Sequence, residues 1–80
     1  MKLPRNLSGA DLVRALERLG YAVTRQKASH LRLTTLRNGE HHVTIPNHDP
    51  LKLGTLAGIL RDVGEHLDLD RDALLEEMFA

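Results

Sequence analysis

Residues 30–45 read HLRLTTLRNGEHHVTI, and their alternation of apolar and polar side chains predicts two strands joined by a turn. Leu31 and Leu33 share one face of the first strand, and Val43 and Ile45 share one face of the second. When these apolar faces coincide, the hairpin buries one side of a sheet and leaves the other side polar. We therefore expect an antiparallel sheet with one buried face.

The length of the loop between these strands follows from which side chains must share a face. A two-residue turn at 38–39 would place apolar residues opposite polar ones on both faces, which a sheet with one buried face does not tolerate. A three-residue loop over 37–39 pairs Leu33 with Val43, and it places Gly39 where a type I turn with a G1 bulge requires positive φ. We therefore predict the three-residue loop.

A helix and a further strand precede the hairpin. Ser8 suits an N-cap and Asp11 stands where a capping box has its acid, so the apolar spacing that follows predicts a helix over 9–19. Gly20 suits the left-handed residue after that helix. Residues 21–25 alternate and predict a short strand, whose core-facing side chains are Tyr21 and Val23.

Two helices follow the hairpin. Residues 46–50 begin and end with proline and predict an irregular connection. Apolar spacing then predicts a helix over 53–63 that ends at Gly64, and Asp68 or Asp70 caps a short last helix. The last helix either completes the core or offers an apolar stripe to a partner or a second copy; its apolar residues are Leu74, Leu75, Met78 and Phe79.

The resulting order is α-β-β-β-α with a short third helix. Three antiparallel strands covered on one side by helices form an α+β sandwich, whose second sheet face is free. The chain contains no internal repeat, low-complexity segment or linker, so we expect one domain over residues 1–80.

The composition excludes several classes of protein. The chain has no cysteine, which rules out disulfides and thiolate metal sites. No apolar run approaches the roughly 18 residues that cross a bilayer, and residues 1–5 lack the apolar core of a signal peptide. One Tyr and one Phe are the only aromatic residues, which favours a thin core over a large ligand cavity. We therefore expect a soluble cytoplasmic protein that does not bind membranes.

The net charge of zero conceals an uneven distribution. Residues 1–37 carry eight basic and two acidic side chains, a net charge of +6, whereas residues 38–80 carry three basic and nine acidic ones, a net charge of −6. This asymmetry favours a basic face for a polyanion. Ordinary solvated surface is the alternative, because the two halves of a sequence need not be halves in space.

Three short motifs carry a family resemblance. Ala28-Ser29-His30 opens the second predicted strand, Ile45-Pro46-Asn47-His48 ends the third, and residues 54–60, GTLAGIL, open the next helix. In this order and spacing they resemble the HicA (YcfA-like) toxins of bacterial type II toxin–antitoxin modules, and the similarity covers residues 8–75. The family has glycine where this chain has Ala28, and alanine fits that turn if its φ is negative.

The resemblance implies a fold similar to that of double-stranded-RNA-binding domains. It also implies a toxin that cleaves mRNA as a metal-independent endoribonuclease, without a cofactor, and that a HicB-type antitoxin inhibits. His30 takes the catalytic role, as a general acid or a general base. Arg25, Lys27 and Arg32 are the cations expected to hold the phosphate, and Ser29 is expected to donate a hydrogen bond to a phosphate oxygen.

The other histidines allow several interpretations. His48 is either a second proton-transfer group near His30 or an anchor for its loop. His41 and His42 point to opposite faces of their strand, and His42 is expected to be solvent-exposed. A zinc site formed by His30, His42 and His48 is rejected, because the spacing matches no zinc motif and no carboxylate is well placed. His66 is expected to be inert.

Two other functions stay open on the sequence. The first is a non-catalytic RNA-binding module of the same fold, which would recognise RNA by shape and backbone contacts. The second is a protein-interaction domain in which the uneven charge serves a charged partner. In both, His30 is an exposed strand residue without a chemical role. The expected partners are thus mRNA, an antitoxin and, for a homodimer, a second copy of the chain.

Overall fold

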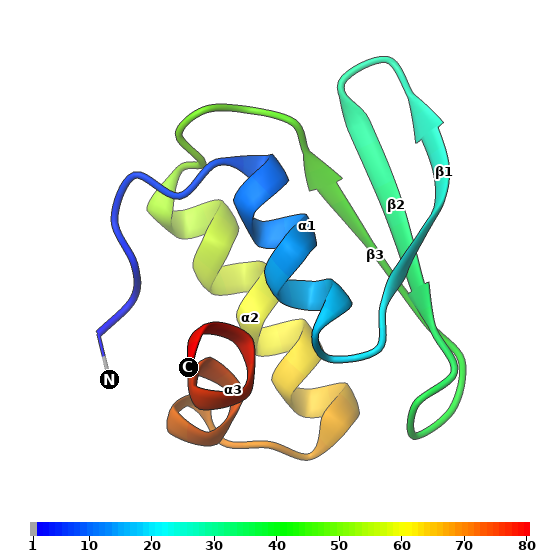
Figure 1. Cartoon of the computed structure of the whole chain (residues 1–80), viewed down its shortest axis with the longest axis vertical. Coiled ribbons are helices and arrows are strands. Elements are labelled where there is room, and N and C mark those ends of the chain that lie inside the picture. Colours follow the sequence, from blue (N-terminus) through cyan, green and yellow to red (C-terminus); the bar gives the residue numbers. More distant parts are fainter. Residues whose placement is uncertain (1) are drawn as a thin grey trace.

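A three-stranded antiparallel sheet forms one layer of the protein, and the helices lie on one side of it (Figure 1). The computed structural model describes residues 2–80. The elements in chain order are α1 (Gly9–Glu17), β1 (Ala22–Lys27), β2 (His30–Thr35), β3 (His41–Pro46), α2 (Leu53–Leu67) and α3 (Arg71–Phe79). The predicted α+β architecture is confirmed. Within residues 2–80, no helix is both long enough and apolar enough to cross a membrane.

The pairing of β2 with β3 follows the predicted register. Leu33 lies opposite Val43, and Leu31 lies opposite Ile45. Leu33, Val43 and Ile45 are buried, so the apolar faces of the two strands meet the core together. The opposite face of the sheet, which we call the free face, points away from the helices (Figure 1).

The β2–β3 loop is longer than predicted and has a different turn. Regular pairing leaves residues 36–40 in the loop, and both Asn38 (φ 58°) and Gly39 (φ 100°) are left-handed, whereas a type I turn has one such residue after it. His66 on α2 accounts for this different loop conformation. Its Nε2 is 2.9 Å from the carbonyl oxygen of Arg37 and 3.0 Å from that of Gly39. The Asn38 side chain donates to the His66 carbonyl (2.8 Å). His66, predicted to be inert, therefore clamps this loop.

A bulge in β1 corrects the prediction for the first strand. Tyr21 is buried as predicted, but Val23 is 42% exposed although it lies opposite core-facing Leu33. β1 is an edge strand of the sheet (Figure 1), and Val23 lies outside the core cluster. The register then shifts between Val23 and Arg25, which places Arg25 opposite Arg32 on the free face.

Leucine supplies most of the core between the sheet and the helices. Leu74, Leu75 and Met78 of α3 are at most 1% exposed, and Phe79 packs against the same cluster. The last helix therefore completes the core, one of its two predicted roles. The buried residues from the other elements include Leu12, Leu16, Leu33, Val43, Ile45, Leu56, Leu60 and Val63.

Local capping signals fix the start of α1. The Ser8 hydroxyl accepts a hydrogen bond from the Asp11 N–H (3.0 Å), and the Asp11 carboxylate accepts one from the Ser8 N–H (3.1 Å). These bonds form the predicted capping box, and the bond from the Ser8 backbone does most to hold the pKa of Asp11 below its usual value. The helix ends at Glu17, two residues earlier than predicted, and Gly20 is left-handed (φ 103°) as expected.

The second helix runs further than predicted. α2 continues through Gly64 to Leu67, and the left-handed residue that ends it is Asp68 (φ 56°). Gly64 serves packing instead: a Cβ there would lie 3.1 Å from the carbonyl oxygen of Leu69, in the connection to α3. Asp70 is the N-cap of α3, as one of the two predicted candidates.

The start of α1 packs backbone to backbone against the segment that follows β3. The Gly9 N–H donates to the carbonyl oxygen of His48 (2.8 Å). A Cβ on Gly9 would clash with the carbonyl oxygen of Pro46, so only glycine fits at this contact. Gly9 therefore joins the first helix to the end of the sheet that carries His30.

We expect Gly9→Ala to lower the free energy of unfolding by roughly 1–3 kcal/mol, since the new methyl must push two backbone segments apart. Gly58→Ala is the matched control, because its Cβ would meet nothing within 4 Å on an exposed part of α2. That change should raise stability by roughly 0.5–1 kcal/mol. Urea unfolding monitored by circular dichroism measures both, and an unchanged Gly9→Ala midpoint would contradict the packing argument.

The only tyrosine of the chain belongs to a polar network beneath the sheet. The Tyr21 hydroxyl is 2.8 Å from Nδ1 of His41, whose Nε2 is 3.1 Å from a carboxylate oxygen of Asp62. His41 also stacks on His66, with ring centroids 4.3 Å apart. His41 thus points to the helix side of β3, opposite to His42 as predicted. Burial, and secondarily the charge of Asp62, raises the pKa of Tyr21 to about 12.

Ultraviolet titration should therefore show tyrosinate forming near pH 12 in the folded protein. Because the folded pKa of Tyr21 lies above the ordinary tyrosine value of 10.0, its contribution to stability is complete below pH 10 and is lost as the pH rises towards 12. Tyr21→Phe should remove this part of the alkaline pH dependence. Tyrosinate formation with an ordinary midpoint while the chain is still folded would contradict the network.

Candidate nucleic-acid interface

Three rows of side chains cross the free face of the sheet, because residues directly opposite on neighbouring strands share a face. His30 lies opposite Lys27 on one side and, as predicted, opposite Pro46 on the other. The next row lies two residues further along each strand. We define the first row as Lys27, His30 and Pro46, and the second row as Arg25, Arg32 and Thr44. The third row is Thr34 and His42 together with Thr24, which lies in the β1 bulge and reaches Thr34 by a hydrogen bond, although Ala22 is the residue directly opposite Thr34.

His30 stands in the middle of the first row, between Lys27 and Pro46, and is exposed. It is the first residue of β2, and the β1–β2 turn that precedes it projects beyond the helices (Figure 1). Both His30 and Lys27 are exposed, and their Cβ atoms are about 5 Å apart as a directly opposed pair. The imidazole is therefore open to a large ligand and has a cation beside it.

The turn before His30 is strained. Ala28 has a φ of 53°, in the left-handed region that alanine rarely adopts. The condition under which alanine would fit this turn, a negative φ, is therefore not met. The two-residue connection between Lys27 and His30 requires the left-handed conformation, which glycine would take without a steric cost.

The cations of the first two rows have no acidic partner. Within residues 2–80, no carboxylate forms an ion pair with Arg25, Lys27 or Arg32. Arg25 and Arg32 also face each other directly, and like charges in opposed positions destabilise a sheet. A bound anion would relieve this repulsion. Each guanidinium group can also bind a phosphate through two parallel hydrogen bonds. The second row is therefore suited to a phosphate.

Backbone contacts hold the β1–β2 turn against the segment after β3. The carbonyl oxygen of exposed Ser29 accepts a hydrogen bond from the Asn47 N–H (2.7 Å). His48 follows, and its carbonyl oxygen anchors Gly9, whereas its exposed ring makes no hydrogen bond within the described chain. The anchoring role of His48 therefore belongs to its backbone, and its imidazole is directed to solvent at the same end of the sheet as His30.

The third row forms a continuous hydrogen-bonded chain that the sequence interpretation missed. Thr24 Oγ1 lies 2.8 Å from Thr34 Oγ1, which lies 2.7 Å from Nδ1 of His42. Nε2 of His42 is 3.0 Å from a carboxylate oxygen of Glu40. His42 is thus opposite Thr34 and on the free face as predicted, but its ring is held at both nitrogens. The sequence did contain a signal for the contact between Glu40 and His42, because residues two apart in an extended segment lie on the same face.

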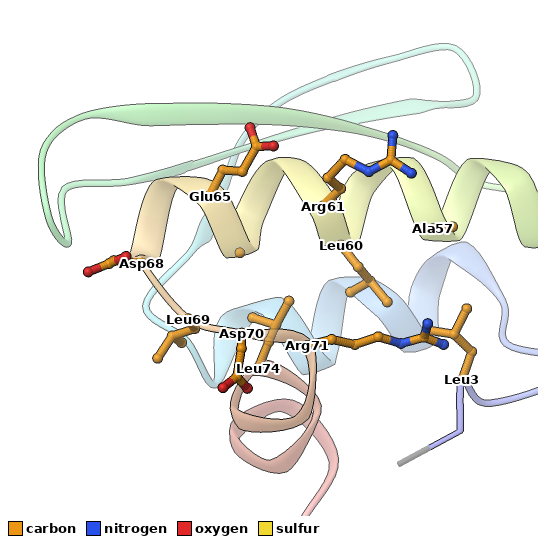
Figure 2. Close-up of a pocket in the computed structure, with 11 residues that line it drawn as sticks. Leu3, Ala57, Leu60, Arg61, Glu65, Asp68, Leu69, Asp70, Arg71 and Leu74 are labelled. Carbon is orange, nitrogen blue, oxygen red and sulfur yellow. The ribbon is translucent and has the colours of Figure 1, made fainter.

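One cavity of the molecule lies away from the free face. A cavity of about 570 Å³ separates α2 from α3, and Leu60 and Leu74 point into the space between the two helices (Figure 2). Its charged lining is mixed, with Glu65, Asp68 and Asp70 beside Arg61 and Arg71. The cavity lies between two helices and away from the free face (Figure 2). No group of three or more histidines and carboxylates within residues 2–80 is arranged to hold a metal ion.

Comparison with known proteins identifies a family. A family model described as the HicA toxin of bacterial toxin-antitoxin matches residues 9–65, more than two thirds of the chain. The matched range includes all three rows of the free face. No curated protein matches the chain, and no solved structure does.

Ala28→Gly should raise the free energy of unfolding by about 1 kcal/mol, because glycine adopts the left-handed conformation without strain. The greater conformational entropy of glycine in the unfolded chain offsets only part of this stabilisation. Ala10→Gly is the matched control, since Ala10 lies in the first turn of α1 and is not left-handed. That change should lower stability by up to about 1 kcal/mol. Equal destabilisation by both substitutions in urea unfolding would contradict the strain.

Proposed function

The chain belongs to the HicA toxin family and has the toxin role of a toxin–antitoxin module, and we propose that it acts as a metal-independent endoribonuclease on mRNA. The observation that supports this activity is the position of His30, which is exposed at the edge of the free face beside cations without acidic partners. Imidazole is the side chain that most readily gains and loses a proton near neutral pH.

The proposed reaction uses the 2′-hydroxyl of the RNA as the nucleophile. The 2′ oxygen attacks the phosphorus, the bond from phosphorus to the 5′ oxygen breaks, and the products are a 2′,3′-cyclic phosphate and a free 5′-hydroxyl. One proton leaves the 2′-hydroxyl and one is delivered to the 5′ oxygen. His30 performs one of these two transfers, and solvent or the exposed His48 ring performs the other.

The surrounding cations bind the phosphates of the RNA during this reaction. Lys27 lies directly opposite His30, and this position supports a role for it in contacting the scissile phosphate. The facing pair of Arg25 and Arg32 binds the neighbouring phosphate, where a bidentate contact fixes the strand. The Ser29 hydroxyl, exposed in the turn, donates to a phosphate oxygen. Fixed positive charge at these positions stabilises the additional negative charge of the transition state.

The same surface explains inhibition by an antitoxin. A HicB-type partner with an acidic surface would cover His30 and neutralise the first two rows, so that neither RNA nor its phosphates gain access. Because these rows are flat and exposed, their occlusion requires no rearrangement of the toxin.

One observation favours a second candidate function, a non-catalytic RNA-binding module. Within the described chain, no hydrogen bond holds the His30 ring in a fixed orientation, unlike the rings of His41, His42 and His66. A catalytic imidazole is commonly oriented by such a partner. Such a module would still bind RNA through the arginine pair, with an affinity that falls as salt increases.

Cleavage of RNA in EDTA distinguishes the two functions. We expect purified wild-type protein to cleave unstructured RNA without metal, and His30→Ala to reduce the rate on the order of 100-fold or more, the contribution of one positioned proton-transfer group. Circular dichroism controls for folding, which the exposed position of His30 should preserve. A wild-type rate no higher than that of His30→Ala would refute catalysis, and salt-dependent binding without cleavage would support the RNA-binding module.

A further inference from the structure

The direction of each hydrogen bond in the third row can be assigned from its chemistry. The carboxylate of Glu40 only accepts, so Nε2 of the neutral His42 imidazole carries the proton and donates it. Nδ1 is then an acceptor, and it takes the hydroxyl proton of Thr34. The Thr34 oxygen accepts in turn from Thr24. The His42 ring is therefore fixed in orientation and tautomer by contacts from β2 and the β2–β3 loop, and Thr24 of β1 supports the Thr34 contact.

The third row lies too far along the sheet from His30 to take part in cleavage. Thr34 lies four residues after His30 on β2, which corresponds to roughly 13 Å at 3.3 Å per residue. His42, directly opposite Thr34, cannot reach the phosphate that His30 contacts. It does lie on the same face, beyond the arginine pair, where an RNA strand that runs along β2 would place a neighbouring nucleotide.

A hydrolytic role for the third row fails for lack of an oxyanion site. Thr34, His42 and Glu40 have the connectivity of a hydroxyl nucleophile, a base and an orienting acid. β2 is the central strand, however, and its amide groups are committed to β1 and β3. A tetrahedral intermediate at Thr34 would therefore find no free backbone N–H donors.

The charge and shape of the third row fit a nucleobase. The carboxylate of Glu40 repels phosphate, in contrast to the cations of the second row. The His42 side chain is 36% exposed, so part of its ring is open for stacking with an unpaired base. The Glu40 side chain is 66% exposed and is an acceptor for an exocyclic amino group, as acidic side chains are for the N4 amino group of cytosine.

On the basis of the proposed function, we infer that His42 and Glu40 form a base-binding subsite. His42, held between Thr34 and Glu40, stacks on an unpaired base one or two nucleotides from the scissile bond, and Glu40 accepts a hydrogen bond from its amino group. The substrate is then single-stranded RNA, because a base within a duplex exposes no face for stacking on His42 and the deep, narrow major groove of A-form RNA keeps side chains from its base edges. Adenine, cytosine and guanine carry an exocyclic amino group and are preferred over uracil, which has none, at this position.

The test maps the cleavage sites of unstructured RNA of randomised sequence. Wild-type protein should discriminate against uracil, the one base without an amino group, at one position near the cut, and His42→Ala should reduce that discrimination about tenfold, the range for one base contact. Glu40→Gln should shift the preference towards uracil, since an amide also donates to its carbonyl oxygens. Glu65→Gln, the same change on exposed α2, should leave the preference unchanged.

A binding measurement keeps this inference separate from catalysis. In the His30→Ala background, the affinities for short single-stranded oligonucleotides that differ at one base should show the same preference, and adding His42→Ala should remove it. A base preference that is the same with and without His42 would overturn the subsite, whether or not the wild type cleaves RNA. Absence of wild-type cleavage with a preference that depends on His42 would refute the nuclease and support the subsite.

Discussion

The pairing of β2 with β3 is the constraint on which the rest of the structure depends. Leu33 and Ile45 are fully buried, and they reach the core together only in the observed register. A shift of one residue would turn these side chains to solvent and would move His30 and Arg32 into the core. The domain would then lose buried apolar area and would have to remove the charge of Arg32 from water, which together would cost more than its folding free energy. The position of the imidazole on the free face is therefore a consequence of core packing.

The zero net charge of the chain conceals a separation of charge in space. The unpaired cations of β1 and β2 lie on the free face, whereas most acidic residues of the second half lie on α2 and α3, on the helix side. Since the field of a surface depends on its local charges, a neutral protein can still attract a polyanion to one face.

The end of the sheet that carries His30 is held by backbone contacts. Ser29 bonds to Asn47, and His48 bonds to Gly9, so the β1–β2 turn, the segment after β3 and the start of α1 form one junction. Ala28 adds left-handed strain to this junction, next to the residue proposed to act in catalysis. Strain of this kind persists only where the surrounding contacts fix the conformation, and it is common at functional sites. These contacts position the imidazole although no side chain holds its ring.

Local patterns in the sequence determined the element order, the capping box at Ser8 and the outward direction of His30, because alternation and capping act between residues close in the chain. Strict alternation from Tyr21 would have turned Arg25 towards the core, and only the bulge in β1 brings it opposite Arg32. The clamp of His66 on the β2–β3 loop and the chain from Thr24 to Glu40 likewise join segments far apart in sequence. Such features depend on which strands and helices become neighbours, so the tertiary structure alone decided them.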